Sequence, residues 1–388
     1  MLKGNMLIAH GGGPTPVINS SLLGAVREAK RHPEIETIYG ARFGAEGILS
    51  GDMIDLGQVS QENLDLLAKS PASALGSCRR KLTDEDYPAV LACFQALNIR
   101  YFFYNGGNDS MDTCHKIHQL AVRSGYELRT IGIPKTIDND LAVTDHCPGF
   151  GSAAKYAAVS SLELAQDVSS LPIHVVVMEL MGRNAGWITA ASALYADQMP
   201  CEHLVYLPEV PFDKVSFLRD VQEKFSKGRG LLVTISEGIH YADGTPVADS
   251  GVVDGFGHKV PGGAAQALSD MIMQETDLKS RAEKPGLLGR VSVALMSDVD
   301  QQEAEQAGAY AVRCATEGQS GAMVGFQTVR QPAYATELCL IPLEQVANAE
   351  KKFPPEWIGA DGCSIQPAFK DYCKPLMGAY DSRFSSIR

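Results

Sequence analysis

The chain has 388 residues, and two domains are expected because single hydrophobic cores stop growing below this length. Its hydrophobic fraction of 45% and charged fraction of 21% are those of an ordinary globular protein, which excludes a fibrous or disordered chain. The formal net charge of −12 argues against nucleic acid or an anionic membrane surface as a partner, because both need a positively charged protein.

The amino-terminal segment and the cysteines give no sign of export. No apolar run has the length of a transmembrane helix, and residues 1–10 lack the long apolar region of a signal peptide, so they are expected to form a strand. The nine cysteines are scattered, with no C-x-x-C pair and no zinc-like spacing to histidine. They predict reduced thiols in a cytoplasmic protein.

Short apolar runs alternate with helical patterns along most of the chain. The predicted strands are Asn5–Ala9, Ile35–Ala41, Arg100–Tyr104, Thr130–Ile133, His174–Leu180, Leu204–Leu207, Leu231–Ile235 and Arg290–Leu295. The predicted helices are Val17–Arg31, Asp84–Leu97, Met111–Ser124, Ser152–Val168, Asp213–Ser226, Gly263–Thr276 and Asp300–Glu317. This alternation predicts an α/β fold with mostly parallel sheets, whose ligands bind beyond the carboxyl ends of the strands. From about Leu340 the alternation stops, and a peripheral extension is expected.

Glycines follow the first predicted strand in the segment His10–Asn19 (HGGGPTPVIN). Consecutive glycines let the backbone approach an anion, and the helix that follows offers unpaired N–H groups at its N-terminus. The pattern is neither a P-loop nor G-x-G-x-x-G. On its own it leaves a structural turn and an anion site equally open.

A second glycine motif, Tyr104–Ser110 (YNGGNDS), again lies between a predicted strand and a helix. Its two glycines, two polar side chains and hydroxyl suit a cradle for phosphate or a metal–phosphate group. The alternative is a structural turn in which Asp109 or Ser110 caps the helix, and a cap can also be a ligand.

The segment Ile133–Asp140 (IPKTIDND) carries three charges within six residues. Pro134 disfavours a helix, so an extended segment is expected, with Asp138 and Asp140 pointing to the same side. One carboxylate could accept a proton while Lys135 neutralises developing phosphate charge, which favours a catalytic site over a solvated loop.

Another motif, Met178–Trp187 (MELMGRNAGW), ends a predicted buried strand. Gly182 gives close access to the backbone, and Arg183 supplies a forked anion donor. Glu209 and Glu237 follow later strands, and a surface charge is the default interpretation of Glu209.

The motifs GGNDS, PKTIDND and MGRNAGW, in this order and spacing, resemble the phosphofructokinase family from the first strand to about Phe326. The resemblance implies two Rossmann-like three-layer domains with the active site in the cleft between them. Residues 1–150 with about 291–340 would bind the phosphoryl donor, 151–290 the sugar phosphate, and 341–388 would form the extension. It also implies a homodimer or homotetramer whose subunits complete each other's sugar site.

The resemblance also implies a role for each matched residue. Asp138 would deprotonate the sugar 1-hydroxyl, and Asp140 would assist at the metal or phosphate side. The catalytic group is expected to be Asp138, Lys135, Asp140 and Arg183. The donor is expected to bind Gly12, Gly13, Arg79, Asp109 and Ser110. The sugar phosphate is expected to bind Thr136, Ile137, Asp138, Met181, Gly182, Arg183 and Glu237.

Two positions indicate pyrophosphate rather than ATP as the donor. Members that use ATP resemble Gly-Gly-Asp-Gly-Ser and carry Gly before Thr-Ile-Asp, where this chain has Asp109 and Lys135. Asp109 would lie where the α-phosphate of ATP sits, and like charges about 4 Å apart cost on the order of 4 kcal/mol. Lys135 would supply positive charge to the leaving phosphate. The expected reaction, reversible and glycolytic, phosphorylates fructose 6-phosphate at its 1-hydroxyl, with Mg²⁺.

Some positions depart from the family pattern. Asn108 stands where a magnesium-binding Asp is usual, and an amide is a poorer ligand for a hard cation. We expect Asn108 and Asp109 at the metal, with Asp140 as a substitute ligand. His174 stands where relatives often carry an Arg for the 6-phosphate, and His174, Lys284 and Arg290 are together expected to form the 6-phosphate site.

Three alternatives remain open, and a fourth, a lipid or NAD kinase, is disfavoured. The open ones are an ATP-dependent phosphofructokinase, a kinase of another sugar phosphate such as sedoheptulose 7-phosphate, and a non-catalytic regulatory subunit. The presence of Asp138, Asp140 and Arg183 argues against a regulatory subunit, although Asn108 leaves it open. Lipid and NAD kinases share only a glycine–aspartate–glycine theme and need no Met-Gly-Arg motif.

Overall fold

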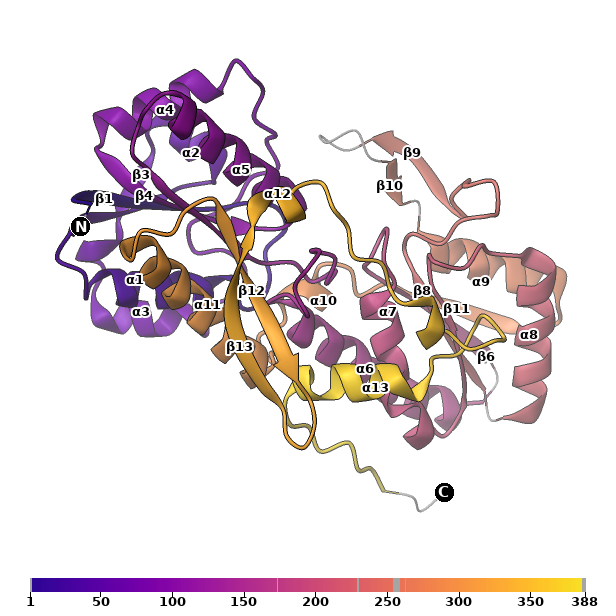
Figure 1. Cartoon of the computed structure of the whole chain (residues 1–388). Helices are drawn as coiled ribbons and strands as arrows, with labels where there is room; N and C mark the ends of the chain where they lie inside the picture. The colour runs from indigo at the N-terminus through magenta and orange to yellow at the C-terminus, as the bar shows by residue number, and fades with distance from the viewer. Residues whose placement is uncertain (1, 173, 229, 254–258, 262, 386–388) are drawn as a thin grey trace. The chain divides into compact units, whose positions relative to one another are not determined.

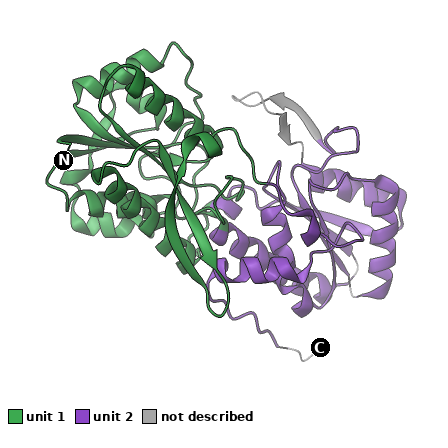
Figure 2. Ribbon diagram, in the orientation of Figure 1, with its two compact units in different colours: residues 1–150, 291–351 green, residues 151–290, 352–388 purple. Residues whose placement is uncertain are grey.

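The computed structural model describes residues 2–385 except 173, 229, 254–258 and 262. The chain divides into two compact units that interleave in sequence (Figure 2). Unit 1 consists of residues 1–150 and 291–351, and unit 2 of residues 151–290 and 352–388. Each unit is built around its own sheet.

The sheet of unit 1 has seven strands in the order β13-β12-β5-β4-β1-β2-β3. The pairs that join β12, β5, β4, β1 and β2 are parallel, and β13 and β3 are antiparallel strands at the two edges. The strands are β1 (Gly4–His10), β2 (Ile35–Ala41), β3 (Met53–Asp55), β4 (Ile99–Gly106), β5 (Arg129–Pro134), β12 (Ala322–Val329) and β13 (Ala335–Pro342). The helices are α1 (Ile18–Ala29), α2 (Ala45–Ser50), the 3-10 helix η1 (Leu56–Gln58), α3 (Gln61–Leu67), α4 (Tyr87–Ala96), α5 (Asn108–Arg123), α11 (Asp298–Thr316) and α12 (Leu343–Val346).

Alternate residues of the central strands serve two separate cores, one on each face of the sheet. Met6 and Ile8 of β1 pack in the cluster that includes α1, α3 and α11. Leu7 and Ala9 pack in the cluster that includes α2, α4, α5 and α12. Both faces are therefore covered by helices, as buried parallel strands require (Figure 1).

The main sheet of unit 2 has four parallel strands in the order β11-β6-β8-β7. Its strands are β6 (His174–Leu180), β7 (Glu202–Tyr206), β8 (Leu231–Ser236) and β11 (Lys279–Glu283), with a separate antiparallel pair β9 (Asp249–Val253) and β10 (Lys259–Pro261). The helices are α6 (Phe150–Ser170), α7 (Trp187–Ala191), η2 (Ser192–Gln198), α8 (Lys214–Lys227), α9 (Ala264–Glu275), α10 (Leu288–Val291), η3 (Pro355–Trp357), α13 (Pro367–Cys373) and η4 (Lys374–Met377).

The predicted α/β fold with mostly parallel sheets is confirmed, but the predicted strand Arg290–Leu295 is wrong. Its residues include the end of α10 and then bends and turns, and none of them is buried. The alternating sequence RVSVAL is typical of a strand, but no strand of the described sheets pairs with it. A strand without a partner leaves its backbone groups unpaired.

The tail, expected to be a peripheral extension, contributes to both units. Leu343 and Val346 belong to a core cluster of unit 1. Residues from 352 onward group with unit 2, where Phe353 and Tyr372 are buried against Trp187 with ring centroids 5.2 and 5.4 Å from it. Aromatic pairs at such distances stabilise a core beyond the area that they bury.

Two glycines allow α1 and α11 to pack against each other closely. A Cβ at Gly24 would lie 1.9 Å from the carbonyl oxygen of Glu305, and one at Gly308 would lie 1.9 Å from that of Ser21. No Cβ is tolerated that close to a backbone atom, so the helices would have to separate.

We expect Gly24→Ala to lower the free energy of unfolding by about 1–3 kcal/mol because of this overpacking. Urea denaturation would measure the change. The control is Gly289→Ala, where the new Cβ would lie 3.6 Å from Tyr156 in ordinary contact, and no loss is expected. Equal unfolding midpoints for wild type and Gly24→Ala would contradict the close packing.

Candidate functional site

Three predicted motifs begin at the same edge of the sheet in unit 1. They follow β1, β4 and β5, which are parallel neighbours. The backbone N–H of Gly11 donates to the carbonyl of Asn105 at 2.9 Å, and that of Lys135 donates to the carbonyl of Gly106 at 3.0 Å. The glycine loop, the GGNDS motif and the PKTIDND motif are therefore adjacent where the strands end.

The glycine loop is fixed by backbone contacts. Gly12 has a φ of +76°, a conformation that favours glycine, and its N–H donates to the carbonyl of Cys78 at 3.1 Å. Ser77 Oγ donates to the carbonyl of Gly12 at 2.7 Å. The exposed Arg79 follows Cys78 directly, so the segment that carries it runs beside the loop.

Lys135 lies under this loop. Its side chain is buried at 3% exposure, and its Nζ donates to the carbonyl of Gly13 at 2.6 Å. Burial, and then the nearby charge of Lys135, lower the pKa of His10 to about 3, so this imidazole is neutral. Lys135 is thus a buried cation beside a glycine turn, an arrangement that favours an anion.

The GGNDS motif opens helix α5. Asn108 and Asp109 lie in its first turn, where a carboxylate is favourable, and Asp109 is exposed. Ser110 is buried, and a Cβ at Gly11 or Gly106 would lie 2.2 or 2.0 Å from its Oγ. These two glycines make room for the serine hydroxyl between the two loops.

The expectation that residues 135–140 are extended is wrong. Ile137 and Asp138 form a turn, and Asn139 has a φ of +54°. The hydroxyl of Thr136 accepts the backbone N–H of Asp138 at 3.1 Å, a local bond that favours a turn. The argument that Asp138 and Asp140 point to the same side of an extended segment therefore does not hold.

Asp140 is held by two donors. Thr136 Oγ1 donates to its Oδ1 at 3.1 Å, and Asn108 Nδ2 donates to its Oδ2 at 2.9 Å. Burial raises the pKa of Asp140, against the hydrogen bond from Thr136. Asp140 therefore joins the PKTIDND turn to the first residue of α5.

The residues around Asp140 fit a metal ion that is shared with a substrate. The Oδ1 atom of Asn108 is buried and has no hydrogen-bond partner within the described part of the chain. No group of three or more His, Cys, Asp or Glu residues that could hold a metal occurs among the described residues. Mg²⁺ commonly takes one or two carboxylates and fills its other positions with substrate phosphates and water. Asp109, Asp140 and the oxygen of Asn108 are suitable donors for such a site.

In unit 2 a second group forms where β6 and β8 end. The N–H of Glu237 donates to the carbonyl of Leu180 at 2.9 Å, and the hydroxyl of Ser236 donates to the carbonyl of Gly182. Gly182 has a φ of +123°. A Cβ at Gly238 would lie 1.7 Å from the carbonyl oxygen of Arg183. The MGR motif, which includes Met181, thus lies against Glu237.

The charges around Glu237 are mixed. Burial and the neighbouring Glu179 raise the pKa of Glu237, and Arg183 and Lys284 oppose this effect. Lys284 follows β11 and pairs with Glu179, with 2.6 Å between Nζ and Oε1. Lys284 therefore belongs to this group.

The structure does not bring His174 and Lys284 together within one chain. His174 is paired with Lys279 at the beginning of β6, whereas Lys284 follows Glu283, which is paired with Met178 near its end. A strand of this length spans roughly 20 Å. Arg290 lies in α10, six residues after Lys284.

Glu209 is not the surface charge that the default interpretation expects. Its Oε1 accepts the backbone N–H of Gly186 at 2.9 Å and that of Phe353 at 3.2 Å, and its Oε2 is buried. Lys352 Nζ donates to the carbonyl of Asn184 at 3.0 Å. The tail thus holds the loop after Arg183, and no local pattern signals contacts between such distant residues.

We expect Glu209→Gln to flatten one part of the dependence of stability on pH. Burial raises the pKa of Glu209 despite its backbone hydrogen bonds, so the folded state binds more protons than the unfolded state between the two pKa values. Stability from this group therefore falls as pH rises from the unfolded value of about 4.3 through the folded one.

The melting temperature of Glu209→Gln relative to wild type should rise across that window. Glu223→Gln, on the exposed surface of α8, is the control and should show no such rise. If the melting temperatures of Glu209→Gln and wild type differ by the same amount at all pH values, burial does not raise the pKa of the Glu209 carboxylate.

Comparisons with known proteins agree with these motifs. A family model described as phosphofructokinase matches residues 5–315. The pyrophosphate–fructose 6-phosphate 1-phosphotransferases of Halomonas elongata and Methylococcus capsulatus are 41% and 42% identical over 391 residues, covering 98% of this chain and 93% of each relative. The crystal structure of the pyrophosphate-dependent phosphofructokinase of Nitrosospira multiformis has a TM-score of 0.90 at 36% identity, covering 100% of this chain and 95% of that one. Within the described residues, no helix has both the length and the apolar character of a membrane span.

Proposed function

This chain belongs to the phosphofructokinase family, and we propose that it transfers a phosphoryl group from pyrophosphate to the 1-hydroxyl of fructose 6-phosphate. The products are fructose 1,6-bisphosphate and phosphate, in a reversible cytoplasmic step of glycolysis. The observation that carries the donor assignment is the buried Lys135 bonded to the glycine loop, with Asp109 on the neighbouring motif.

Unit 1 would bind the donor. The glycine loop offers the backbone of Gly12 and Gly13, and Lys135 supplies a positive charge beneath it. Arg79 and Ser110, on the segments beside the loop, would complete the contacts to pyrophosphate. Developing charge on the leaving phosphate is best stabilised by a cation that is already in place.

Asp138 is the proposed base and Asp140 the residue that fixes its turn. Both oxygens of Asp140 accept hydrogen bonds, from Thr136 and Asn108, which suits a holding role. Asp138 lies in the same turn and is half-buried. A general base must reach the hydroxyl that it deprotonates, and we assign the sugar 1-hydroxyl to Asp138.

A divalent metal, which we propose is Mg²⁺, would be held by Asp109 and the oxygen of Asn108, with Asp140 beside them. When bound, it would neutralise phosphate charge and orient the transferred group. The substrate must provide other ligands, because the described residues contain no larger cluster.

Unit 2 would bind the sugar phosphate through the MGR motif, Glu237, Lys284 and Arg290, and the turn of unit 1 would add Thr136 and Ile137. The proposed 6-phosphate site includes His174, yet His174 lies at the far end of β6 from Lys284. This separation supports a homodimer or homotetramer in which each subunit lends residues such as His174 to another subunit's sugar site.

We expect Asp138→Asn to lower kcat by about 10²–10⁴-fold with pyrophosphate and fructose 6-phosphate, while sugar binding remains. The substitution removes a proton acceptor but keeps size and hydrogen bonding. Steady-state kinetics and calorimetric binding of fructose 6-phosphate would measure both. Asp52→Asn, at an exposed position directly before β3, should leave kcat unchanged. A kcat of Asp138→Asn within a few-fold of wild type would remove Asp138 from the role of base.

Donor choice should depend on Asp109 and Lys135 together. Asp109→Gly is expected to let ATP bind and to weaken activity with pyrophosphate, because it removes a carboxylate and its bulk. Lys135→Gly should mainly lower turnover with pyrophosphate, since its charge matters most as the phosphate departs. The double variant should lose less than the product of the single losses.

Kinetics with each donor would test this pair, and Asp109→Asn would separate charge from size. A wild type that prefers ATP, or an Asp109→Gly variant that gains no ATP binding, would overturn the donor assignment. If the enzyme does not phosphorylate fructose 6-phosphate but does phosphorylate a longer sugar phosphate, only the proposed acceptor would have to be replaced.

A further inference from the structure

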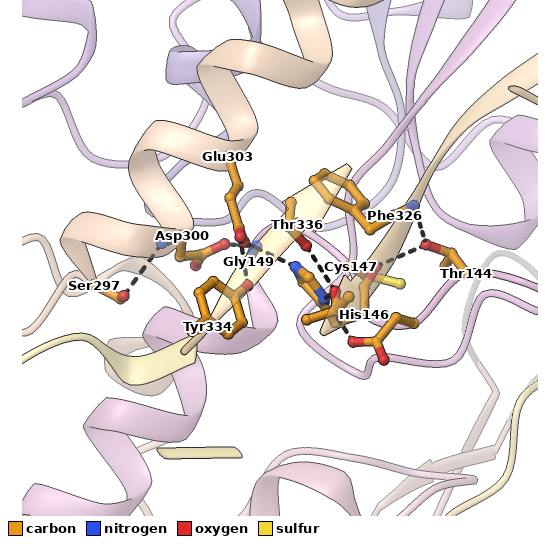
Figure 3. Close-up of polar contacts among 12 residues, drawn as sticks. Thr144, His146, Cys147, Gly149, Ser297, Asp300, Glu303, Phe326, Tyr334 and Thr336 are labelled. Carbon is orange, nitrogen blue, oxygen red and sulfur yellow. Dashed lines mark hydrogen bonds and ion pairs between the residues drawn. The ribbon is translucent and has the colours of Figure 1, made fainter. Parts of the chain in front are cut away.

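A cluster of charged and polar side chains, buried at His146 and Glu303 and half-buried at its other members, lies around the segment that follows the PKTIDND turn, and no step proposed above uses it. We call it the His146 cluster, and its members come from the loop after Leu141, from α11, from the residue after β12 and from the segment before β13. Figure 3 labels three of them, His146, Glu303 and Tyr334. They are Asp145, His146, Glu303, Arg330 and Tyr334. All of them belong to unit 1.

His146 lies between two carboxylates. Its Nδ1 is 2.9 Å from Oδ1 of Asp145, and its Nε2 is 2.8 Å from Oε2 of Glu303. The exposed fractions of His146 and Glu303 are 2% and 6%. An imidazole can donate from both nitrogens only when it is protonated. The geometry therefore fits an imidazolium.

A charged His146 gives each carboxylate of the cluster a positive partner. Arg330 donates to both oxygens of Asp145, at 2.9 and 2.7 Å, so that carboxylate already has a cation. Glu303 has the hydroxyl of Tyr334 on one oxygen and His146 on the other. Without the imidazolium, Glu303 would be a buried carboxylate with no cation paired to it among the described residues, which is costly.

The protonation of His146 follows from these partners. Burial alone would lower the pKa of His146, but the hydrogen bonds to Asp145 and Glu303 raise it above its ordinary value. The charged and titratable groups around it on the packed elements are Asp145, Glu303, Arg330, Tyr334 and Lys351. Lys351 donates to the carbonyls of Thr144 and Asp145, at 3.2 and 2.7 Å.

The three residues after His146 connect the cluster to the PKTIDND turn. The N–H of Cys147 donates to Oδ1 of Asn139 at 3.0 Å, and the carbonyl of Pro148 accepts the N–H of Thr136 at 3.1 Å. The N–H of Gly149 donates to Oδ1 of Asp300 at 2.8 Å. Residues 146–149 thus contact the turn in their middle and α11 at both ends.

Helix α11 provides both of these contacts, to His146 and to Gly149, from one of its faces. Asp300 and Glu303 are three residues apart, so their side chains are neighbours on the helix. Asp300 is at the start of α11, where the hydroxyl of Ser297 accepts its N–H at 3.2 Å. Figure 3 shows both acids reaching from α11 toward the segment 146–149.

The backbone of the turn is left-handed at Asn139, where φ is +54°. Asn adopts this conformation more readily than other non-glycine residues do, but the conformation still depends on contacts that hold it. The side chain of Asn139 is fully buried and accepts from Cys147 and, at 3.5 Å, from Lys351. Asn139 separates Asp138 from Asp140, so a change there moves both carboxylates.

We infer that His146, as an imidazolium between Asp145 and Glu303, is a positioning residue that holds the catalytic turn Thr136–Asp140 in its working geometry. This inference rests on the function proposed above for that turn. His146 itself contacts none of the proposed substrate-binding residues through a described hydrogen bond, and it acts through residues 147–149.

The test compares His146→Gln, the double variant His146→Gln with Glu303→Gln, and the control His32→Gln in the full chain. His32 also lies between two carboxylates of unit 1, at 3.3 Å from Glu28 and 3.6 Å from Glu34. It precedes β2, however, and so lies near the amino-terminal ends of the strands, opposite the end that carries the candidate site. The double variant removes the unpaired carboxylate together with the imidazolium.

We expect His146→Gln to lower kcat by ~10–100-fold with little change in KM, because small misplacements of catalytic groups are costly. Hydrogen exchange should become faster in a peptide covering residues 134–149 and not in α5. The double variant should recover most of both properties, and His32→Gln should match wild type.

The ratio of wild-type to His146→Gln kcat should also depend on pH. The stabilising charge is fully present below the unfolded pKa of about 6.5 and is lost as pH rises through the higher folded pKa. The ratio should therefore fall with increasing pH across that range. A ratio that does not change with pH would contradict the role of the imidazolium.

Wild-type kcat and exchange in His146→Gln would overturn the inference, as would faster exchange throughout unit 1 with no recovery in the double variant. If the chain shows no activity with pyrophosphate and fructose 6-phosphate, the proposed function fails, but exchange still decides the inference. Faster exchange confined to residues 134–149 supports it, and unchanged exchange there refutes it.

Discussion

The parallel pairing of β1, β4 and β5 is the constraint on which the candidate site depends. The carboxyl ends of parallel neighbouring strands lie at the same end of a sheet, so the strand pairing alone brings together loops that are far apart in sequence. The backbone bonds of Gly11 and Lys135 to residues of β4 then fix how closely the loops approach. Side-chain chemistry is added to this frame, with Lys135 under the glycine loop and Asp140 bonded to Asn108.

Around that frame, unit 1 uses buried polar groups where many proteins use apolar contacts. The turn after Lys135 is held by Thr136, Asn139, Lys351 and the residues that follow His146. Hydrogen-bonded buried charges cost desolvation, but they define one geometry more sharply than interchangeable apolar side chains do. A turn that must place carboxylates for proton transfer benefits from such definition.

Much of the fold and the motifs of the candidate site were predictable from the sequence. Apolar strands followed by glycine and charged residues signalled the sheet edge, because that pattern is local. The contacts of Glu209 with Phe353 and of Asp300 with Gly149 could not be predicted from the sequence, because they join residues more than 100 positions apart. The turn at Asn139 was missed because Pro134 only disfavours a helix and does not distinguish a turn from an extended segment. The strand expected at Arg290–Leu295 failed because periodicity does not reveal whether a partner strand exists.

The interleaving of the two units has a consequence for synthesis on the ribosome. The chain passes between the units three times, so neither unit is contiguous. The sheet of unit 1 lacks β12 and β13 until residue 342 has been made, and Trp187 of unit 2 stays without Phe353, Phe369 and Tyr372 for even longer. Domains usually fold in order as they emerge. Here, the nascent chain must carry two incomplete cores almost to its end, and both are completed nearly together.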